Sequence, residues 1–67
     1  MSFKVGDAVI RHWNKQLYFI CHDVDGDKQE FLISENKGEK VSKCKVCEHV
    51  SNLTLATPKE IEQGYRD

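Results

Sequence analysis

The sequence predicts a single, mainly β domain over residues 1–67: a small barrel or strongly bent sheet of about five strands, roughly residues 3–56, closed by a short helix at about 58–65. Short runs of β-forming residues alternate with tight-turn signals. A helix-capping sequence precedes the last apolar positions. A chain of 67 residues, 39% of them hydrophobic, can bury one small core, and nothing resembling a linker divides it.

The first strand is expected just after Gly6 and Asp7, where the chain bends and then continues as Ala8-Val9-Ile10. Residues 12–16 are polar apart from Trp13 and are interpreted as a connection. The apolar run over residues 17–21 is rich in β-formers and is interpreted as the second strand.

Two glycine-containing turns separate the later strands. Residues 23–27 include Asp25-Gly26, a pair that favours a tight hairpin. The third strand is expected over residues 29–34, and a second turn over residues 35–39. Residues 39–50 are interpreted as a fourth strand, and its imperfect apolar alternation predicts a kink or bulge.

The C-terminal helix has the clearest local signal. Thr57, Pro58 and Glu60 occupy the N-cap, N1 and N3 positions of a capping box. So short a helix is not stable in isolation, so it must dock on the sheet. Ile61 and Tyr65 lie one helical turn apart, and we expect them to make that contact.

Both ends of the chain resemble a family of small proteins encoded by phages and prophages. The stretch Val5-Gly6-Asp7-Ala8-Val9-Ile10 is similar to the start of many SH3-like barrels. The stretch from Asn52 to Ile61, with Gly64 and Arg66 after it, resembles the ending of those phage proteins. The resemblance implies a small SH3-like β-barrel of mobile-element origin and implies no activity. The cysteine pair at positions 44 and 47 is not part of the family pattern.

Charge and cysteine content narrow the setting. The net charge is −1, so overall charge gives no argument for nucleic acid. An odd number of cysteines and no apolar segment near the N-terminus predict a cytoplasmic protein with reduced thiols. No apolar run approaches the ~18 residues needed to span a membrane, and no membrane partner is expected.

Two clusters of positive charge are the candidate binding residues. One surrounds the tryptophan of the first connection, and the other is a run of lysines in the predicted fourth strand. Because tryptophan is costly to expose, the simpler expectation is that Trp13 folds onto the core; if exposed, it is the best candidate for a contact residue. The candidates are Arg11, His12, Trp13 and Lys15, and Lys37, Lys40, Lys43 and Lys45.

A zinc site is a weaker alternative, and no cofactor is otherwise expected. Cys44 and Cys47 have Cys-x-x-Cys spacing, His49 follows, and Cys21 or His22 could complete a tetrahedral set. However, residues i and i+3 of a strand point to opposite faces, so both thiolates could converge only at a turn or bulge. Ordinary structural cysteines are the simpler interpretation.

The other candidate sites are weaker. The acidic residues Asp23, Asp25 and Asp27 resemble half of a calcium loop, but a glutamate is missing at the twelfth position, so a solvated hairpin is the simpler interpretation. No glycine-rich phosphate loop, nucleophile elbow or paired catalytic carboxylates are recognisable, which predicts a protein that is not an enzyme.

The function expected from the sequence is therefore binding. The first hypothesis is a protein-interaction module of phage or mobile-element origin whose partner is a host protein or a second copy of itself, as a homodimer. The alternative is a nucleic-acid-binding barrel that uses the Arg11–Lys15 connection and the lysine-rich fourth strand.

Overall fold

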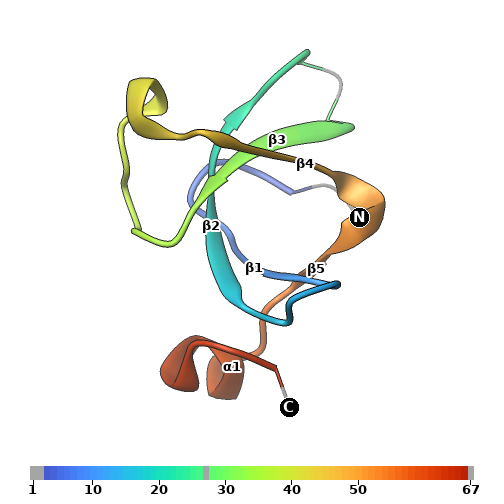
Figure 1. The fold of residues 1–67 in the computed structure, drawn as a ribbon, viewed down its shortest axis with the longest axis vertical. Coiled ribbons are helices and arrows are strands. Elements are labelled where there is room, and N and C mark those ends of the chain that lie inside the picture. The colour runs from blue at the N-terminus through green and yellow to red at the C-terminus, as the bar shows by residue number, and fades with distance from the viewer. Residues whose placement is uncertain (1–2, 27, 67) are drawn as a thin grey trace.

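A computed structural model describes residues 3–26 and 28–66 of the chain. It is mainly β, with five strands and one short α-helix (Figure 1). The elements are β1 Ala8–Arg11, β2 Leu17–Asp23, β3 Glu30–Ser34, β4 Val46–His49, β5 Leu53–Leu55 and α1 Pro58–Gln63, with 3-10 turns η1 at Val41–Lys43 and η2 at Val50–Asn52.

The five strands form one antiparallel sheet in the order β4-β3-β2-β1-β5. The sheet is not closed into a barrel, because β4 and β5 remain its two edges within the described residues. It is nevertheless strongly bent. Arg11 of β1 and Glu48 of β4, which are separated by two strands in the sheet order, form an ion pair of 2.6 Å. The expected β fold is thus confirmed, with an open, folded-over sheet in place of a closed barrel.

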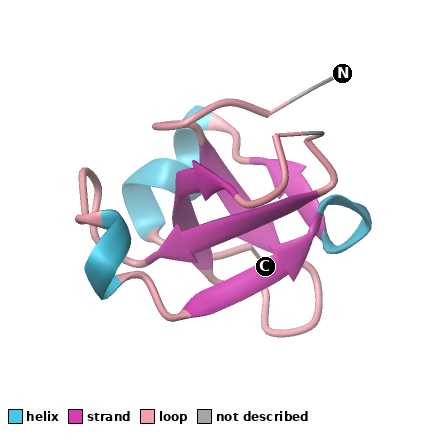
Figure 2. Ribbon diagram, turned by 90° about the horizontal axis from the view of Figure 1, so that it is seen from above, coloured by secondary structure: helices cyan, strands magenta, loops and turns pink. Residues whose placement is uncertain are grey.

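The bend brings the two halves of the sheet around one core. In Figure 1 the β3–β4 hairpin lies across from β1 and β5, and β2 runs between the two pairs. Figure 2 shows the strands crossing at the centre, with the helical segments at the rim. The core contains Phe3, Val9, Tyr18, Ile20, Phe31, Ile33 and Leu53. Phe3 and Phe31 pack edge to face at 5.9 Å, which ties the N-terminal segment to the hairpin.

A bulge in β2 explains an unexpected disulfide between Cys21 and Cys44. The register of β2 against β3 shifts between Ile20 and His22, and Ile20 and Cys21 are both buried. A regular strand would place these neighbours on opposite faces. Cys21 forms a disulfide with Cys44 across 23 residues of sequence. The prediction that all cysteines are reduced thiols is therefore wrong for this pair.

The predicted fourth strand is broken into three pieces. A 3-10 turn, η1, precedes β4, and η2 follows it directly, so the expected kink is present at both ends. The four lysines of the run precede β4 and lie in the β3–β4 connection. The expectation of a lysine-rich fourth strand is therefore wrong, because that segment turns before it pairs.

The C-terminal helix begins as predicted. The Thr57 side chain accepts a hydrogen bond from the Glu60 N–H, and the Glu60 carboxylate accepts one from the Thr57 N–H. The helix ends at Gly64, whose φ of 87° is left-handed and favours glycine. No helix in the described ranges is long and apolar enough to cross a bilayer.

The docking of α1 differs from the prediction. Ile61 and Tyr65 are 45% and 49% exposed, so they do not anchor the helix in the core. The chain after α1 instead pairs with the β1–β2 connection: Leu17 N–H donates to the Gly64 carbonyl at 3.0 Å, and Arg66 N–H donates to the Lys15 carbonyl at 2.8 Å. Backbone pairing replaces the expected apolar contact because the helix is too short to present an apolar face.

Candidate functional site

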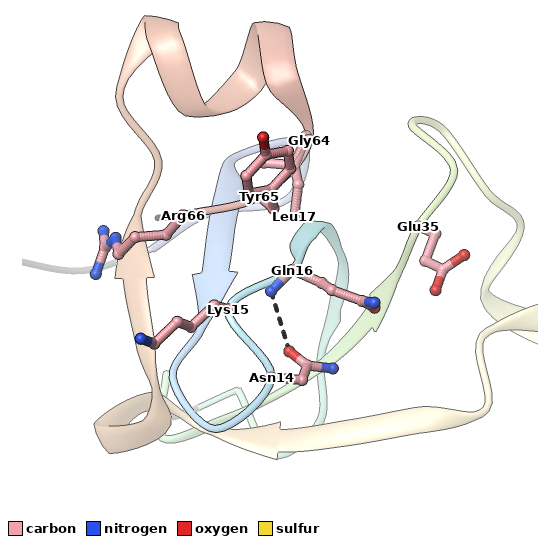
Figure 3. Close-up of a pocket in the computed structure, with 8 residues that line it drawn as sticks. All are labelled: Asn14, Lys15, Gln16, Leu17, Glu35, Gly64, Tyr65 and Arg66. Atoms are coloured by element: carbon pink, nitrogen blue, oxygen red, sulfur yellow. Dashed lines mark hydrogen bonds between the residues drawn. The ribbon is translucent and has the colours of Figure 1, made fainter.

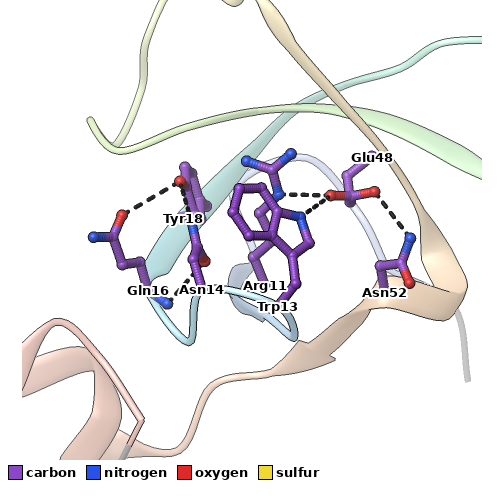
Figure 4. Close-up of polar contacts among 7 residues, drawn as sticks. All are labelled: Arg11, Trp13, Asn14, Gln16, Tyr18, Glu48 and Asn52. Carbon is purple, nitrogen blue, oxygen red and sulfur yellow. Dashed lines mark hydrogen bonds and ion pairs between the residues drawn. The ribbon is translucent and has the colours of Figure 1, made fainter.

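The centre of the candidate site is Trp13, in the connection between β1 and β2 (Figure 4). Its side chain is 68% exposed, so the expectation that it folds onto the core is wrong. Its indole N–H donates a hydrogen bond of 3.2 Å to Glu48, and the Arg11 guanidinium lies 4.2 Å from the centre of its ring. Trp13 is thus exposed and held in place at the same time.

Glu48 organises this arrangement from the opposite half of the sheet. Its Oε1 pairs with Arg11 at 2.6 Å, and its Oε2 accepts a hydrogen bond of 3.0 Å from Asn52. Burial alone would raise the pKa of Glu48. The hydrogen bonds from Arg11, Asn52 and Trp13 outweigh that effect and lower the pKa below its ordinary value. Glu48 therefore stays ionised and neutralises Arg11.

Tyr18 supports Arg11 from below the surface. The Arg11 guanidinium lies 5.7 Å from the Tyr18 ring, so the cation is close to two aromatic rings. The Tyr18 hydroxyl accepts a hydrogen bond of 3.0 Å from Asn14 and donates one of 3.4 Å to Gln16. These contacts fix the β1–β2 connection, and we call Trp13, Arg11, Tyr18 and Glu48 the Trp13 platform.

The remaining residues of the first predicted cluster lie beside the platform. The His12 ring is hydrogen-bonded to the Thr54 hydroxyl of β5. Lys15 adopts a left-handed backbone conformation with φ of 58°, and its side chain is exposed. Arg11 differs from these two, because its charge is half-buried and paired, so it is not available to bind an anion.

Three open depressions lined by described residues lie next to the β1–β2 connection, β5 and the β3–β4 connection. The first, about 660 Å³, lies between the β1–β2 connection and the C-terminal segment (Figure 3). The second, about 380 Å³, lies beside β5, and the third, about 290 Å³, lies under the β3–β4 connection. The first is lined by Asn14, Lys15, Gln16, Leu17, Glu35, Gly64, Tyr65 and Arg66; the second by Ile10, His12, Lys15, Thr54 and Arg66; and the third by Tyr18, Ser34, Glu35, Asn36, Glu39, Lys43, Lys45 and Val46.

Neighbouring depressions have lining residues in common, and we call the three together the groove. Lys15 and Arg66 line both the first and the second depression, and Glu35 lines both the first and the third. The groove therefore joins the two predicted basic clusters at Lys15 and at Lys43 and Lys45. Lys37 and Lys40 are exposed on the same connection but do not line the groove.

The residues of the zinc alternative do not converge. Cys44 is bonded to Cys21, whereas the exposed Cys47 thiol contacts Glu30 at 3.5 Å and the His49 ring bonds the Ser51 hydroxyl at 2.8 Å. No group of three metal-ligating side chains occurs in residues 3–26 and 28–66. Partial burial and the Glu30 carboxylate raise the pKa of the Cys47 thiol, which makes it less reactive. The acidic hairpin is structural where it is described: the Asp23 carboxylate caps the turn at Gly26 and Lys28, whereas Asp27 lies outside the described residues.

Sequence reasoning missed Glu48 and Asn52 as site residues, and it missed the position of Tyr65 and Arg66 in the wall of the groove. A signal for Glu48 was available, because Val46, Glu48 and Val50 alternate along the chain and share the half-buried face of their segment. An acidic side chain on such a face needs a cationic partner. Nothing in the sequence identified that partner as Arg11, since the pair forms only when the sheet folds over.

No protein-family model matches the chain, and neither a curated protein nor a solved structure matches it.

Proposed function

We propose that this protein is a non-enzymatic binding module of phage or mobile-element origin that binds an extended segment of a partner protein through the Trp13 platform and the groove. The observation that carries the proposal is that Trp13, 68% exposed, is held by Glu48 and Arg11. Exposing a tryptophan is unfavourable unless a partner covers it, and tryptophan is enriched among the residues that dominate binding energy.

The contacts around Trp13 favour tight binding for a physical reason. A free aromatic side chain loses rotamer entropy when a partner immobilises it. The Trp13 ring is already oriented by the indole hydrogen bond and by the Arg11 guanidinium against it. One face of the ring is thus covered by Arg11, and the exposed part of the side chain offers preformed apolar area to a partner.

The charge pattern of the groove favours a peptide over a nucleic acid. Its lining includes the basic residues Lys15, Arg66, Lys43 and Lys45 and the acidic residues Glu35 and Glu39. Grooves that bind single-stranded nucleic acid are uniformly positive, because every phosphate along the strand is negative. Mixed charge matches a polypeptide with side chains of both signs, and the net charge of −1 agrees.

Nucleic-acid binding remains the second candidate, because the groove connects the two basic clusters that the sequence singled out. The test uses the intrinsic fluorescence of Trp13, the single tryptophan of the chain. Oligothymidylate should quench that fluorescence at low salt and lose affinity steeply as salt rises if the second candidate is correct. Unchanged fluorescence at low salt rejects it.

The partner proposal is tested with Trp13→Ala against a matched control. The control is Val41→Ala, which also removes an exposed apolar side chain (47% exposed) but at η1, away from the platform. A partner from bacterial lysate, identified by mass spectrometry and then purified, should bind the wild type and the control alike. Trp13→Ala should weaken binding by about 2 kcal/mol, roughly thirtyfold. Equal binding by all three proteins rejects the platform as the contact surface, and light scattering shows whether the partner is a second copy.

The finer fold assignment is also a proposal. The strand order, with β1 between β2 and β5, and the 3-10 turn that joins β4 directly to β5 support an SH3-like arrangement of the open sheet. An experimental structure tests it through the packing of β4 against β1.

A further inference from the structure

Lys15 has an unusual backbone. Its φ of 58° is left-handed, a conformation that costs an ordinary L-residue about 1 kcal/mol and that glycine or asparagine adopts more easily. The chain is held there by hydrogen bonds of 2.8 Å from the Lys15 N–H to the Arg11 carbonyl and from the Arg66 N–H to the Lys15 carbonyl. A lysine at this position therefore carries a conformational cost that an asparagine would avoid.

No interaction of the Lys15 side chain with the described residues offsets this conformational cost. The side chain is exposed, and in the two described ranges its ammonium group has no ion pair or hydrogen bond. Backbone strain alone does not assign a function, but strain at an exposed residue that also lines a depression favours one. The groove gives that function a location, because Lys15 lines two of the three depressions.

Two further residues with N–H groups, Arg66 and His12, line the second depression together with Lys15. Figure 3 shows the Lys15 and Arg66 side chains on the same side of the groove. The Arg66 guanidinium donates from Nε and Nη2 to the Glu60 carboxylate, at 2.5 and 3.3 Å. Within residues 3–26 and 28–66 the other N–H groups of Arg66 have no side-chain acceptor, so they can donate to a ligand. His12 and Thr54, joined by a hydrogen bond, also line this depression. Among the residues that the structure describes, no acidic side chain lines this second depression.

We propose that Lys15, Arg66 and His12 form a carboxylate-binding subsite that takes an aspartate or glutamate side chain of the partner segment. This inference rests on the proposed function, of which it specifies the partner chemistry. Lys15 supplies a positive charge that no residue in the described ranges pairs, and Arg66 supplies planar donors that match a carboxylate. Lys15 and Trp13 belong to one short connection, so a single partner segment can contact both.

The test uses a blocked hexaglutamate peptide and amide NMR of the full chain at fixed ionic strength. Saturable shifts are expected at His12, Lys15, Thr54 and Arg66. Lys15→Asn should weaken binding by about fivefold, because it removes one solvent-exposed ion pair between the Lys15 ammonium and a glutamate of the peptide. This variant should fold at least as well as the wild type, because asparagine tolerates the left-handed conformation. A thermal melt checks that.

Lys28→Asn is a matched control. Lys28 is also exposed and left-handed, with φ of 61°, but it lies in the β2–β3 turn beside Asp23. The change in net charge and in backbone strain is therefore the same as in Lys15→Asn. Hexaglutamate should bind Lys28→Asn as it binds the wild type.

Two outcomes overturn the inference. Equal weakening by both lysine variants would show that hexaglutamate senses only net charge. Binding of an oligothymidylate of equal charge at these amides, without binding of hexaglutamate, would assign the subsite to phosphate. Neither readout uses the natural partner, so a failure here is distinguishable from a failure of the Trp13→Ala test.

Discussion

Single residues on opposite halves of the sheet hold the candidate site together, and Glu48 is the most important of them. It receives hydrogen bonds from Arg11 and Trp13, which lie 37 and 35 positions away in the sequence, and from Asn52 of η2. The Arg11 and Glu48 side chains are only 16% and 11% exposed, so solvent screens their interaction poorly. Glu48 therefore acts on both the stability of the bent sheet and the orientation of the tryptophan.

Replacing Glu48 by glutamine should lower the free energy of unfolding by about 1–3 kcal/mol. The amide keeps the shape but leaves the half-buried Arg11 charge without a counter-charge. Urea denaturation measures the loss, with Glu62→Gln as a control at an exposed position of α1. If the two variants are equally stable, the Arg11–Glu48 pair does not support the fold.

The Glu60–Arg66 pair predicts a dependence of stability on pH. The Arg66 guanidinium and the Thr57 N–H lower the pKa of Glu60 from 4.5 to about 2. Because the folded pKa is depressed, this stabilisation is fully present above pH 4.5 and disappears as the pH falls towards 2. Arg66→Gln should therefore reduce the fall in melting temperature between about pH 5 and pH 2. An acid-melting profile identical to that of the wild type would contradict this role.

At the scale of elements, α1 and the segment after it form locally, and that segment then pairs with the β1–β2 connection of the sheet. The capping box starts the helix, Gly64 ends it, and the chain returns to pair with the β1–β2 connection. The isolated pairing of Gln16 with Tyr65 continues this contact. The helix therefore places Tyr65 and Arg66 in the wall of the groove rather than filling the core.

Thr57→Ala should destabilise the protein by about 1 kcal/mol, because the Glu60 N–H loses its capping acceptor. Lys59→Ala, at an exposed position of the same first turn, is the control. Thermal unfolding compares the two. The amide signals of Arg66 should also shift in Thr57→Ala and not in Lys59→Ala, because Glu60 bonds both the Thr57 cap and the Arg66 guanidinium.

At the scale of the whole molecule, the disulfide connects the centre of the sheet to its most basic segment. Cys21 lies in β2, and Cys44 ends η1 between the lysines of the β3–β4 connection. This link holds the wall of the third depression, where Lys43 and Lys45 stand. Disulfides are uncommon in reducing compartments, so the oxidation state of this pair in cells also tests the expected cytoplasmic setting.

Reduction of the disulfide should lower the free energy of unfolding by about 3 kcal/mol, the chain-entropy value for a loop of this length. Denaturation with and without a dithiol reductant measures it. Cys47→Ser should respond to the reductant as the wild type does, because Cys47 is a free, exposed cysteine. A Cys44→Ser variant as stable as the oxidised wild type would show that the link contributes nothing.

The sequence by itself determined the features that depend on neighbours in the chain. The positions of β1, β2 and β3, the two glycine turns and the start of α1 follow from β-propensity, positive φ and capping, which act over a few residues. The candidate cluster around Trp13 was also found, because cations and an aromatic stand together in one short connection.

The tertiary structure decided everything that needs two distant segments to meet. The bend of the sheet exposes Trp13 and pairs Arg11 with Glu48; the β2 bulge turns Cys21 towards Cys44; and the return of the chain after α1 builds the groove beside Lys15. Each depends on a contact between residues more than twenty positions apart, or on a break in strand alternation. Local propensity carries no information about such contacts, because their stability comes from packing and charge pairing that exist only once the chain has folded.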